Sequence, residues 1–244
     1  MRLIAFVAAA GVLACGANNV SAADLPVKAA PVAVAAFNWT GWYLGGSAGY
    51  AWGNSTMTEV TAYNGPPAIS YSPRGFQGGI HGGYNKQIQQ IVVGVEVEFG
   101  YLGVSKSQQY PPYIGVRTAN DSVAGTSNGW FGVVAGRLGW AMNNWLIYGK
   151  GGGIFTGIKS SFIDTDPIGT TLVSGTQTSN RNGWVLGFGV EHAFNRNWIA
   201  RVEYDRYGFG TARHTALTPV GTPFTFSHSL NLNSVRLGVS YLFH

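Results

Sequence analysis

Large apolar side chains alternate with small or polar ones in eight separate segments of the chain. The clearest is Ile91–Tyr101, where six large apolar residues occupy every second position and Glu96 and Glu98 lie between them. A period of two is typical of β-strands with one apolar face. The segments are Gly41–Trp52, Gly75–Lys86, Ile91–Tyr101, Gly129–Ala141, Trp145–Phe155, Gly183–Ala193, Trp198–Tyr207 and the run through Val235 to Phe243.

The links between these segments alternate in length. Three are short, namely 88–90, 143–144 and 194–197, and four are long, namely 53–74, 105–128, 159–182 and 208–231. Short turns at one end and long loops at the other are typical of membrane barrels. The sequence therefore predicts an all-β fold, an eight-stranded antiparallel up-and-down transmembrane β-barrel in the bacterial outer membrane. An even number of strands places both termini on the periplasmic side.

Tryptophan positions support a membrane barrel independently. All eight tryptophans lie at or just outside a predicted strand end, and indole rings favour the membrane–water interface. Trp39 is expected at the same rim as Trp42. Tryptophans buried in a soluble β-sandwich are the alternative, which would not require rings at both strand ends. The expected aromatic girdle consists of Trp42, Trp52, Trp130, Trp140, Trp145, Trp184, Trp198 and Tyr241.

Composition narrows the fold classes further. Charged residues make up 10% of the 244 residues and glycine occurs 36 times, a mixture that disfavours a protein of long helices. Beyond the N-terminus no run of 18 apolar residues occurs, so a closed barrel is the remaining way to cross a membrane with every backbone amide paired. The small basic excess is not clustered and gives no support for nucleic-acid binding.

The N-terminus has the features of a secretory signal peptide. Arg2 supplies the positive charge, Leu3–Ala14 form a short apolar run, and cleavage sites follow after Ala22 or Ala23. We expect a signal peptide over 1–22, a periplasmic Pro/Ala-rich leader over 23–38 and the barrel over 39–244. The residues around Cys15 also resemble a lipoprotein lipidation box, which leaves open whether Cys15 is lipidated.

The polar alternates, assigned to the barrel interior, comprise five acids and four bases. Eight strands enclose a space just wide enough for their own side chains, so we expect these charges to pair with one another. A narrow or gated ion path is the alternative. The predicted lumen charge network consists of Glu96, Glu98, Arg137, Lys150, Glu191, Arg201, Glu203, Asp205 and Arg236.

No motif indicates catalysis or a metal site. Gly45–Gly49 matches the G-x-S-x-G pattern of a nucleophile elbow, but that motif needs a strand-to-helix turn and this stretch lies within a predicted strand. The histidines lack metal-ligand spacing. His214 and His228 share the last long loop and could contact hemin, and exposed loop histidines without a ligand are the alternative. We expect no catalytic residue, no metal and no cofactor.

Basic residues near the predicted outer rim suggest a lipid partner. Guanidinium and ammonium groups suit phosphate oxygens. We therefore expect contacts with outer-membrane lipid and lipopolysaccharide from Arg74, Lys106, Lys159, Arg181 and Arg206.

Two motifs carry a resemblance to a known family. The opening Phe37–Gly46, FNWTGWYLGG, and the ending Ser234–Phe243, SVRLGVSYLF, resemble the first and last strands of alphaproteobacterial outer-membrane barrels in the OmpA/opacity-like porin superfamily. The resemblance implies that Tyr241 and Phe243 form the signal read by the barrel-assembly machinery, although His244 follows where an aromatic residue normally ends the chain. Relatives are described as surface antigens, envelope-stabilising proteins, small porins and hemin binders.

The residues and this resemblance together predict a structural and surface-interaction role in the cell envelope. The sequence does not name the surface ligand. The alternatives are a narrow porin for small solutes or ions and a hemin-binding surface receptor.

Overall fold

The structure is a computed structural model that describes residues 37–59, 68–109, 122–165, 171–217 and 223–244. The predicted signal peptide and most of the predicted leader lie outside these ranges. The described residues contain no helix able to cross a membrane. Their strands are β1 (Gly41–Glu59), β2 (Ala68–Tyr71), β3 (Arg74–Ile88), β4 (Ile91–Leu102), β5 (Ser105–Gln109), β6 (Ser122–Met142), β7 (Trp145–Thr165), β8 (Thr171–Ala193), β9 (Trp198–Leu217) and β10 (Pro223–Phe243).

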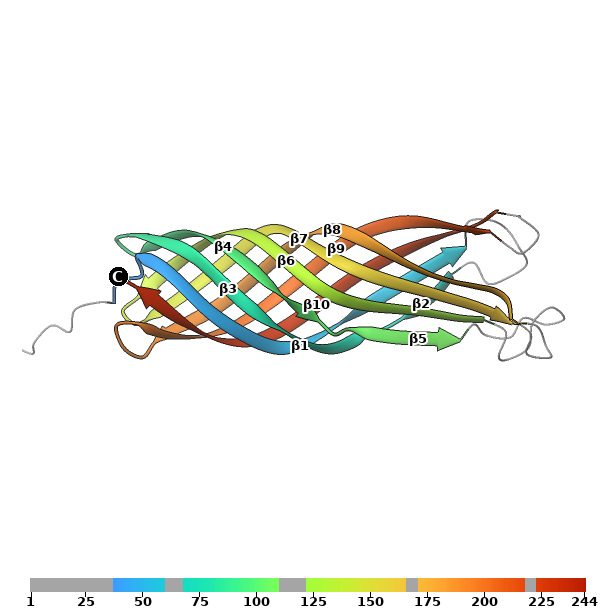
Figure 1. Cartoon of the computed structure of the whole chain (residues 1–244). Coiled ribbons are helices and arrows are strands. Elements are labelled where there is room, and N and C mark those ends of the chain that lie inside the picture. The colour runs from blue at the N-terminus through green and yellow to red at the C-terminus, as the bar shows by residue number, and fades with distance from the viewer. Residues whose placement is uncertain (1–36, 60–67, 110–121, 166–170, 218–222) are drawn as a thin grey trace, which may run out of the picture. The chain divides into compact units, whose positions relative to one another are not determined.

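The ten strand segments make a closed barrel of eight strands (Figure 1). β2 continues into β3 across Ser72 and Pro73, and β4 continues into β5 across Gly103 and Val104. Proline cannot donate a ladder hydrogen bond, which accounts for the first interruption. Each long strand pairs antiparallel with its neighbours in the chain, and β1 pairs with both β3 and β10. The predicted eight-stranded up-and-down barrel is confirmed.

The strand register shows that the strands are tilted. A path through directly opposed residues starts at Trp42, passes once around the barrel and returns to β1 at Trp52, ten residues further along. A stagger of this kind requires strands to incline to the barrel axis, as Figure 1 shows. Height in the wall is therefore best counted along each strand from its own turn.

Three tight turns lie at one end of the barrel, which we call the turn end. Gln89 and Asn143 open two of them with φ of 56° and 52°, a left-handed conformation that asparagine adopts more readily than most residues. In the third, Asn195 Oδ1 accepts hydrogen bonds from the backbone N–H groups of Asn197 and Trp198, both at 2.9 Å. The predicted short links are confirmed.

The predicted long loops are wrong in extent. β7 and β8 stay paired as far as Thr165 and Thr171, so only 166–170 separate them instead of the expected 159–182. The other strands extend similarly, leaving 60–67, 110–121 and 218–222 between described strands. Both alternating positions in these extensions carry many serine, threonine and asparagine residues, so apolar alternation cannot reveal them. We call this end of the barrel the loop end.

The outward face of the barrel carries the large apolar alternates. Trp42, Phe76 and Leu237 expose 65%, 78% and 64% of their surface, whereas the intervening Tyr43 and Arg236 are buried. A closed wall that exposes so many large apolar side chains is suited to contact with hydrocarbon rather than water.

The interior is filled by three layers of side chains, and β7 passes through all of them. Leu146 and Tyr148 lie nearest the turn end, Lys150 follows, and Ile154 and Ile158 lie toward the loop end, all of them buried. Apolar residues therefore lie on both sides of a charged layer. The sequence did not predict these two apolar layers, because it assigned the interior to polar alternates.

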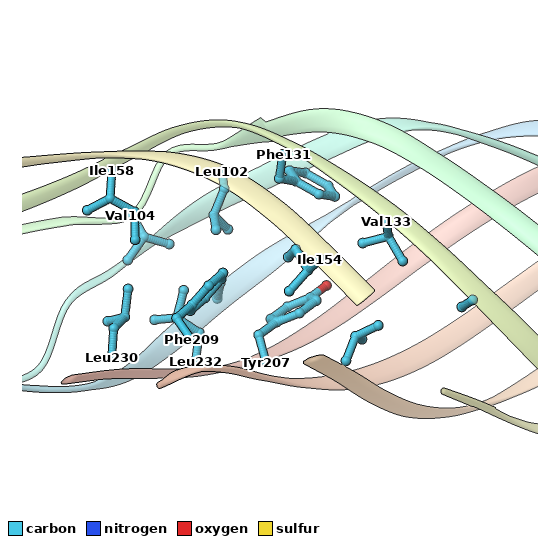
Figure 2. Packing of buried hydrophobic residues seen from close by; sticks show 13 residues of the cluster. Leu102, Val104, Phe131, Val133, Ile154, Ile158, Tyr207, Phe209, Leu230 and Leu232 are labelled. Atoms are coloured by element: carbon cyan, nitrogen blue, oxygen red, sulfur yellow. The ribbon is translucent and has the colours of Figure 1, made fainter. Parts of the chain in front are cut away.

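The apolar layer nearer the loop end, here the loop-end layer, is a cluster of side chains that are each at most 5% exposed. Figure 2 shows its side chains projecting from strands around the barrel toward a common centre. Large aliphatic and aromatic groups that pack together in this way leave little space for water between them. The layer consists of Ala51, Leu102, Val104, Phe131, Val133, Ala135, Ile154, Ile158, Val185, Tyr207, Phe209, Leu230 and Leu232.

The second apolar layer, the turn-end layer, contains Trp39. The prediction that Trp39 lines the periplasmic rim beside Trp42 is wrong, because its side chain is fully buried. Its backbone N–H donates to Gln87 Oε1 at 2.8 Å, and Phe37 packs edge-on against its ring. The layer comprises Trp39, Tyr43, Val92, Ala141, Leu146, Tyr148, Ala193, Ile199 and Leu242.

Candidate functional site

The charged layer between the two apolar layers is the most concentrated chemistry in the described part of the barrel. The structure places all nine residues of the predicted lumen charge network inside, each at most 4% exposed. They come from six strands: Glu96 and Glu98 from β4, Arg137 from β6, Lys150 from β7, Glu191 from β8, Arg201, Glu203 and Asp205 from β9, and Arg236 from β10.

Lys150 lies at the centre of the network. Its Nζ is 2.8 Å from Glu203 Oε1 and 3.3 Å from Asp205 Oδ1. Glu96 Oε1 and Glu98 Oε2 lie at 3.4 and 3.8 Å from the same atom. One ammonium group therefore serves four buried carboxylates from β4 and β9.

Two arginines bracket the carboxylates nearer the turn end. Glu191 Oε1 accepts from Arg137 Nη2 at 2.8 Å and lies 2.9 Å from Arg201 Nη2. Glu96 Oε2 lies 2.8 Å from Arg201 Nη1 and accepts from the Tyr43 hydroxyl at 2.9 Å. Each arginine thus bridges the same two glutamates, which fixes β4, β6, β8 and β9 relative to one another.

Arg236 occupies the other side of the network. It forms ion pairs with Glu98 and Glu203, and its Nη2 donates to Asp205 Oδ2 at 2.6 Å. The Tyr207 hydroxyl donates to the same Asp205 oxygen at 3.1 Å. Because β10 pairs with β1, these contacts brace the wall beside the seam where the first and last strands close the barrel.

Tyrosines that the sequence analysis did not single out complete the network. The Tyr148 hydroxyl donates to Glu203 Oε2 at 2.5 Å, and the Arg137 guanidinium lies 4.0 Å from the centre of the Tyr148 ring. Tyr43 accepts from Arg137 Nη1 at 3.0 Å. The signal for both was available, because each tyrosine lies on the inward alternate of its strand. Their aromatic bodies join the turn-end layer while their hydroxyls reach the charges.

Three carboxylates of the network come close enough to hold a metal ion. Oxygens of Glu96, Glu98 and Glu203 all lie within 4.8 Å of one another. The Lys150 ammonium contacts oxygens of all three residues, so a side chain of the chain itself supplies the positive charge that these carboxylates need. The arrangement is that of an internal ion-pair network.

A polar group lies above the loop-end layer. His228 Nε2 is 2.5 Å from Ser55 Oγ and 3.3 Å from the Tyr71 hydroxyl, and Arg181 donates to the His228 carbonyl at 3.2 Å. The prediction that His214 and His228 share a long loop is wrong. His214 lies in β9 and His228 in β10, and the His228 side chain is fully buried inside the barrel.

The residues of the expected aromatic girdle lie on the outward face. Trp42, Trp140, Trp145 and Trp198 mark the turn end, and the loop-end ring consists of Trp52, Trp130 and Trp184. All seven expose at least 39% of their surface. Tyr241 contacts Trp198 and Phe243 with ring centres 5.3 and 4.9 Å apart, and Phe243 is directly opposed to Trp42.

The five basic residues expected at the outer rim do not all lie on the surface. Arg74, Lys106, Lys159 and Arg206 are exposed. Arg181 is only 5% exposed and projects inward to the His228 carbonyl, so its expected contact with lipid is wrong. The inward register of Arg181 could not be recognised because the sequence placed it in a loop.

Comparisons with known proteins agree with this architecture. A family model described as outer membrane protein beta-barrel domain matches residues 10–243. The chain is 32% identical over 245 residues to a 31 kDa outer-membrane immunogenic protein of Brucella melitensis biotype 1, covering 96% of this chain and 98% of that protein.

Two solved structures share the fold. The outer membrane protein OprG from Pseudomonas aeruginosa has a TM-score of 0.57 at 13% identity, covering 85% of this chain and 98% of the other. The outer membrane protease OmpT from Escherichia coli has a TM-score of 0.54 at 10% identity, covering 86% and 99%. At such low identity the likeness concerns the fold and carries no activity across.

Proposed function

The chain belongs to the outer membrane protein beta-barrel domain family and lies in the outer membrane, and we propose that it is a sealed structural barrel that displays its loop end outside the cell. The observation that carries this proposal is the three-layered interior. Two apolar layers enclose a charge network whose members form ion pairs with one another. Such an interior braces the wall and offers no continuous polar path.

The orientation follows from the two ends of the barrel. Short turns face the periplasm and long connections face outward in barrels of this type. The three tight turns and the C-terminal residue His244 lie at the turn end (Figure 1). We therefore place the turn end and both termini on the periplasmic side and the loop end at the cell surface, where a protein or glycan partner could reach it.

Conductance tests the sealed interior. The mature protein, refolded into planar bilayers, should show no stepwise current above the lipid background, because an ion would have to cross dry apolar layers. Heat-dependent migration on gels confirms that the same sample is folded. Reproducible unitary steps from a folded sample would contradict the proposal and favour the narrow porin. The hemin-receptor alternative loses its argument, since His228 is buried.

We also propose that exposed cations near the loop end contact lipopolysaccharide phosphates. Arg74 and Lys159 support this, because each lies fourteen residues along its strand from the turn-end residues Ile88 and Trp145. At about 2.5 Å of height per tilted residue, this places them about 35 Å up, beyond a hydrocarbon band of about 25 Å. Lipopolysaccharide that co-purifies with the barrel should fall when Arg74, Lys106 and Lys159 are replaced together by glutamine.

The last strand is proposed to carry the assembly signal. Tyr241 and Phe243 lie on the outward side of β10, where their rings contact each other. In cells, Phe243→Ala should lower the heat-modifiable, membrane-inserted fraction several-fold, whereas Val239→Ala on the same face of β10 should not. Equal insertion of both variants would contradict the assignment to Phe243.

A further inference from the structure

Arg206 has an unusual position on the outward face. It lies on β9 eight residues from Trp198, which corresponds to about 20 Å of height, still inside a hydrocarbon band of about 25 Å. Trp184 packs over Gly208, which lies two residues from Arg206 toward the loop end. A Cβ at Gly208 would come within 2.4 Å of the Trp184 ring. Arg206 therefore lies on the turn-end side of the loop-end aromatic ring, lower than Arg74 and Lys159.

An exposed arginine at this depth must direct its guanidinium group to the interface or meet a counter-charge. Charged side chains facing lipid are unfavourable unless they reach the interface or meet a counter-charge. Among the described residues, no carboxylate lies within ion-pair distance of Arg206. Arg206 lies about 5 Å below the edge of the hydrocarbon band on this estimate, within reach of the interface for an arginine side chain. The anionic groups that it meets there are the phosphates of lipid headgroups.

Two neighbouring polar groups make the position a site rather than a single charge. Asn233 on β10 is directly opposed to Arg206. Its Oδ1 accepts a hydrogen bond from the Tyr204 hydroxyl at 2.8 Å, which leaves the amide nitrogen as a donor. Arg206 and Asn233 thus present adjacent donors on the outward wall, an arrangement suited to a phosphate group. We call Arg206, Asn233 and Tyr204 together the polar notch.

An apolar groove begins one strand away from the notch. Leu186 on β8 is directly opposed to Arg206 on one side and to Gly151 of β7 on the other. Beyond Leu186 lies a shallow groove of about 570 Å³ whose floor includes Gly136, Gly149 and Gly151. A Cβ at Gly136 would meet nothing within 4 Å, and one at Gly151 would lie 3.8 Å from Leu186. The groove is open space on the hydrocarbon-facing wall.

We propose that the polar notch and this groove together bind one molecule of lipid A, the phosphorylated glycolipid anchor of lipopolysaccharide. A phosphate accepts hydrogen bonds from Arg206 and Asn233, and one acyl chain crosses Leu186 into the groove. Gly149 lies four residues and Gly151 six residues from Trp145, so the groove is deeper in the membrane than Arg206, as the chain below a headgroup must be. The inference rests on the orientation proposed above, which puts the loop end in the outer leaflet.

Native mass spectrometry of the folded, full-length mature protein from mild detergent tests the inference, with lipid A, a phospholipid or inorganic phosphate added as separate probes. The wild type should carry one lipid A that resists activation. Arg206→Leu should lower the occupied fraction about tenfold or more, and Gly151→Leu or Gly136→Val should lower it several-fold by filling the groove. Arg213→Leu is the matched control, since Arg213 is an exposed arginine on the same strand, and it should retain the adduct.

Each other outcome would overturn the inference. Unchanged occupancy in Arg206→Leu, or an equal loss in Arg213→Leu, would remove the role of the notch. If Arg206→Leu lost the lipid A adduct and both groove variants kept it, the site would be a phosphate contact only. A preference for phospholipid or inorganic phosphate would exclude lipid A. Conductance of the wild type would contradict the sealed barrel but leave the adduct count unaffected, so the two proposals fail separately.

Discussion

The charge network and the loop-end layer fill the same interior by different physical means. In the network, one ammonium group lies within 3.8 Å of oxygens from four carboxylates, so the residues depend on one another. In the loop-end layer, thirteen apolar residues share the contact, and dispersion and burial are spread among many pairs. The difference teaches that equal burial does not mean equal tolerance, because losing one charge leaves several others unpaired.

Replacement of Lys150 by methionine should have the largest effect. The substitution keeps most of the side-chain volume but removes the one charge among the described residues that contacts all of Glu96, Glu98, Glu203 and Asp205. Breaking a buried ion pair by removing one partner typically costs about 3–5 kcal/mol. We expect a loss at the upper end of that range, measured as a shift in urea midpoint for the folded band on gels.

The control for this prediction neutralises one of the carboxylates that Lys150→Met leaves without its partner. Lys150→Met combined with Glu203→Gln should recover part of the lost stability, because the nearest carboxylate is neutralised at the same time. No recovery in the double variant would show that the packing of the lysine stem, rather than its charge, dominates. The charge network would then resemble the apolar layer after all.

Truncation of Phe131 should have the next largest effect. Phe131 on β6 is fully buried in the loop-end layer, and its ring lies close to Gly100, where a Cβ would meet it at 2.9 Å. Phe131→Ala removes contacts and leaves a cavity, which costs about 3 kcal/mol or slightly more in well-packed cores. The loss is measured as the change in the free energy of unfolding from urea titration. Val134→Ala, on the outward face of the same strand, is the control.

If Phe131→Ala lowered the free energy of unfolding more than Lys150→Met, the ranking of the two layers would be reversed.

The Phe131→Ala variant also tests the proposed sealed interior. Because the turn-end layer and the charge network stay intact, the Phe131→Ala barrel should remain non-conducting. Current through this variant would show that the loop-end layer is the only barrier.

The same contrast explains what the sequence could and could not predict. The inward acids and bases were found because each interrupts a strongly apolar alternation, as Glu96 and Glu98 do within Ile91–Tyr101. Inward apolar residues such as Phe131 and Val133 leave no such signal, since both faces of the strand are apolar there. The two apolar layers were therefore missed.

Strand ends show a related limit. At the turn end, the strands begin directly after tight turns, and the predicted boundaries at Ile91, Trp145 and Trp198 agree with the structure. At the loop end, pairing continues through polar stretches such as 159–165. Backbone hydrogen bonds hold those extensions, and they leave no pattern in side-chain polarity. That is why His228 and Arg181 were placed in loops although they face the interior.

Neutralising Asp205 should have the smallest effect and is the finest test of the comparison. The network contains five acids and four bases, so one negative charge lacks a full counter-charge. Asp205→Asn removes that surplus while its side-chain oxygen can still accept from Tyr207. We expect a change within about 1 kcal/mol, since removing both the charge and its need for a partner is often nearly neutral.

Glu203→Gln is the matched control. Glu203 contacts Lys150 at 2.8 Å and Tyr148 at 2.5 Å, and its loss should cost about 2–3 kcal/mol. If urea titration gave equal losses for the two variants, the network would have no surplus charge, and its five carboxylates would depend on their partners to the same degree.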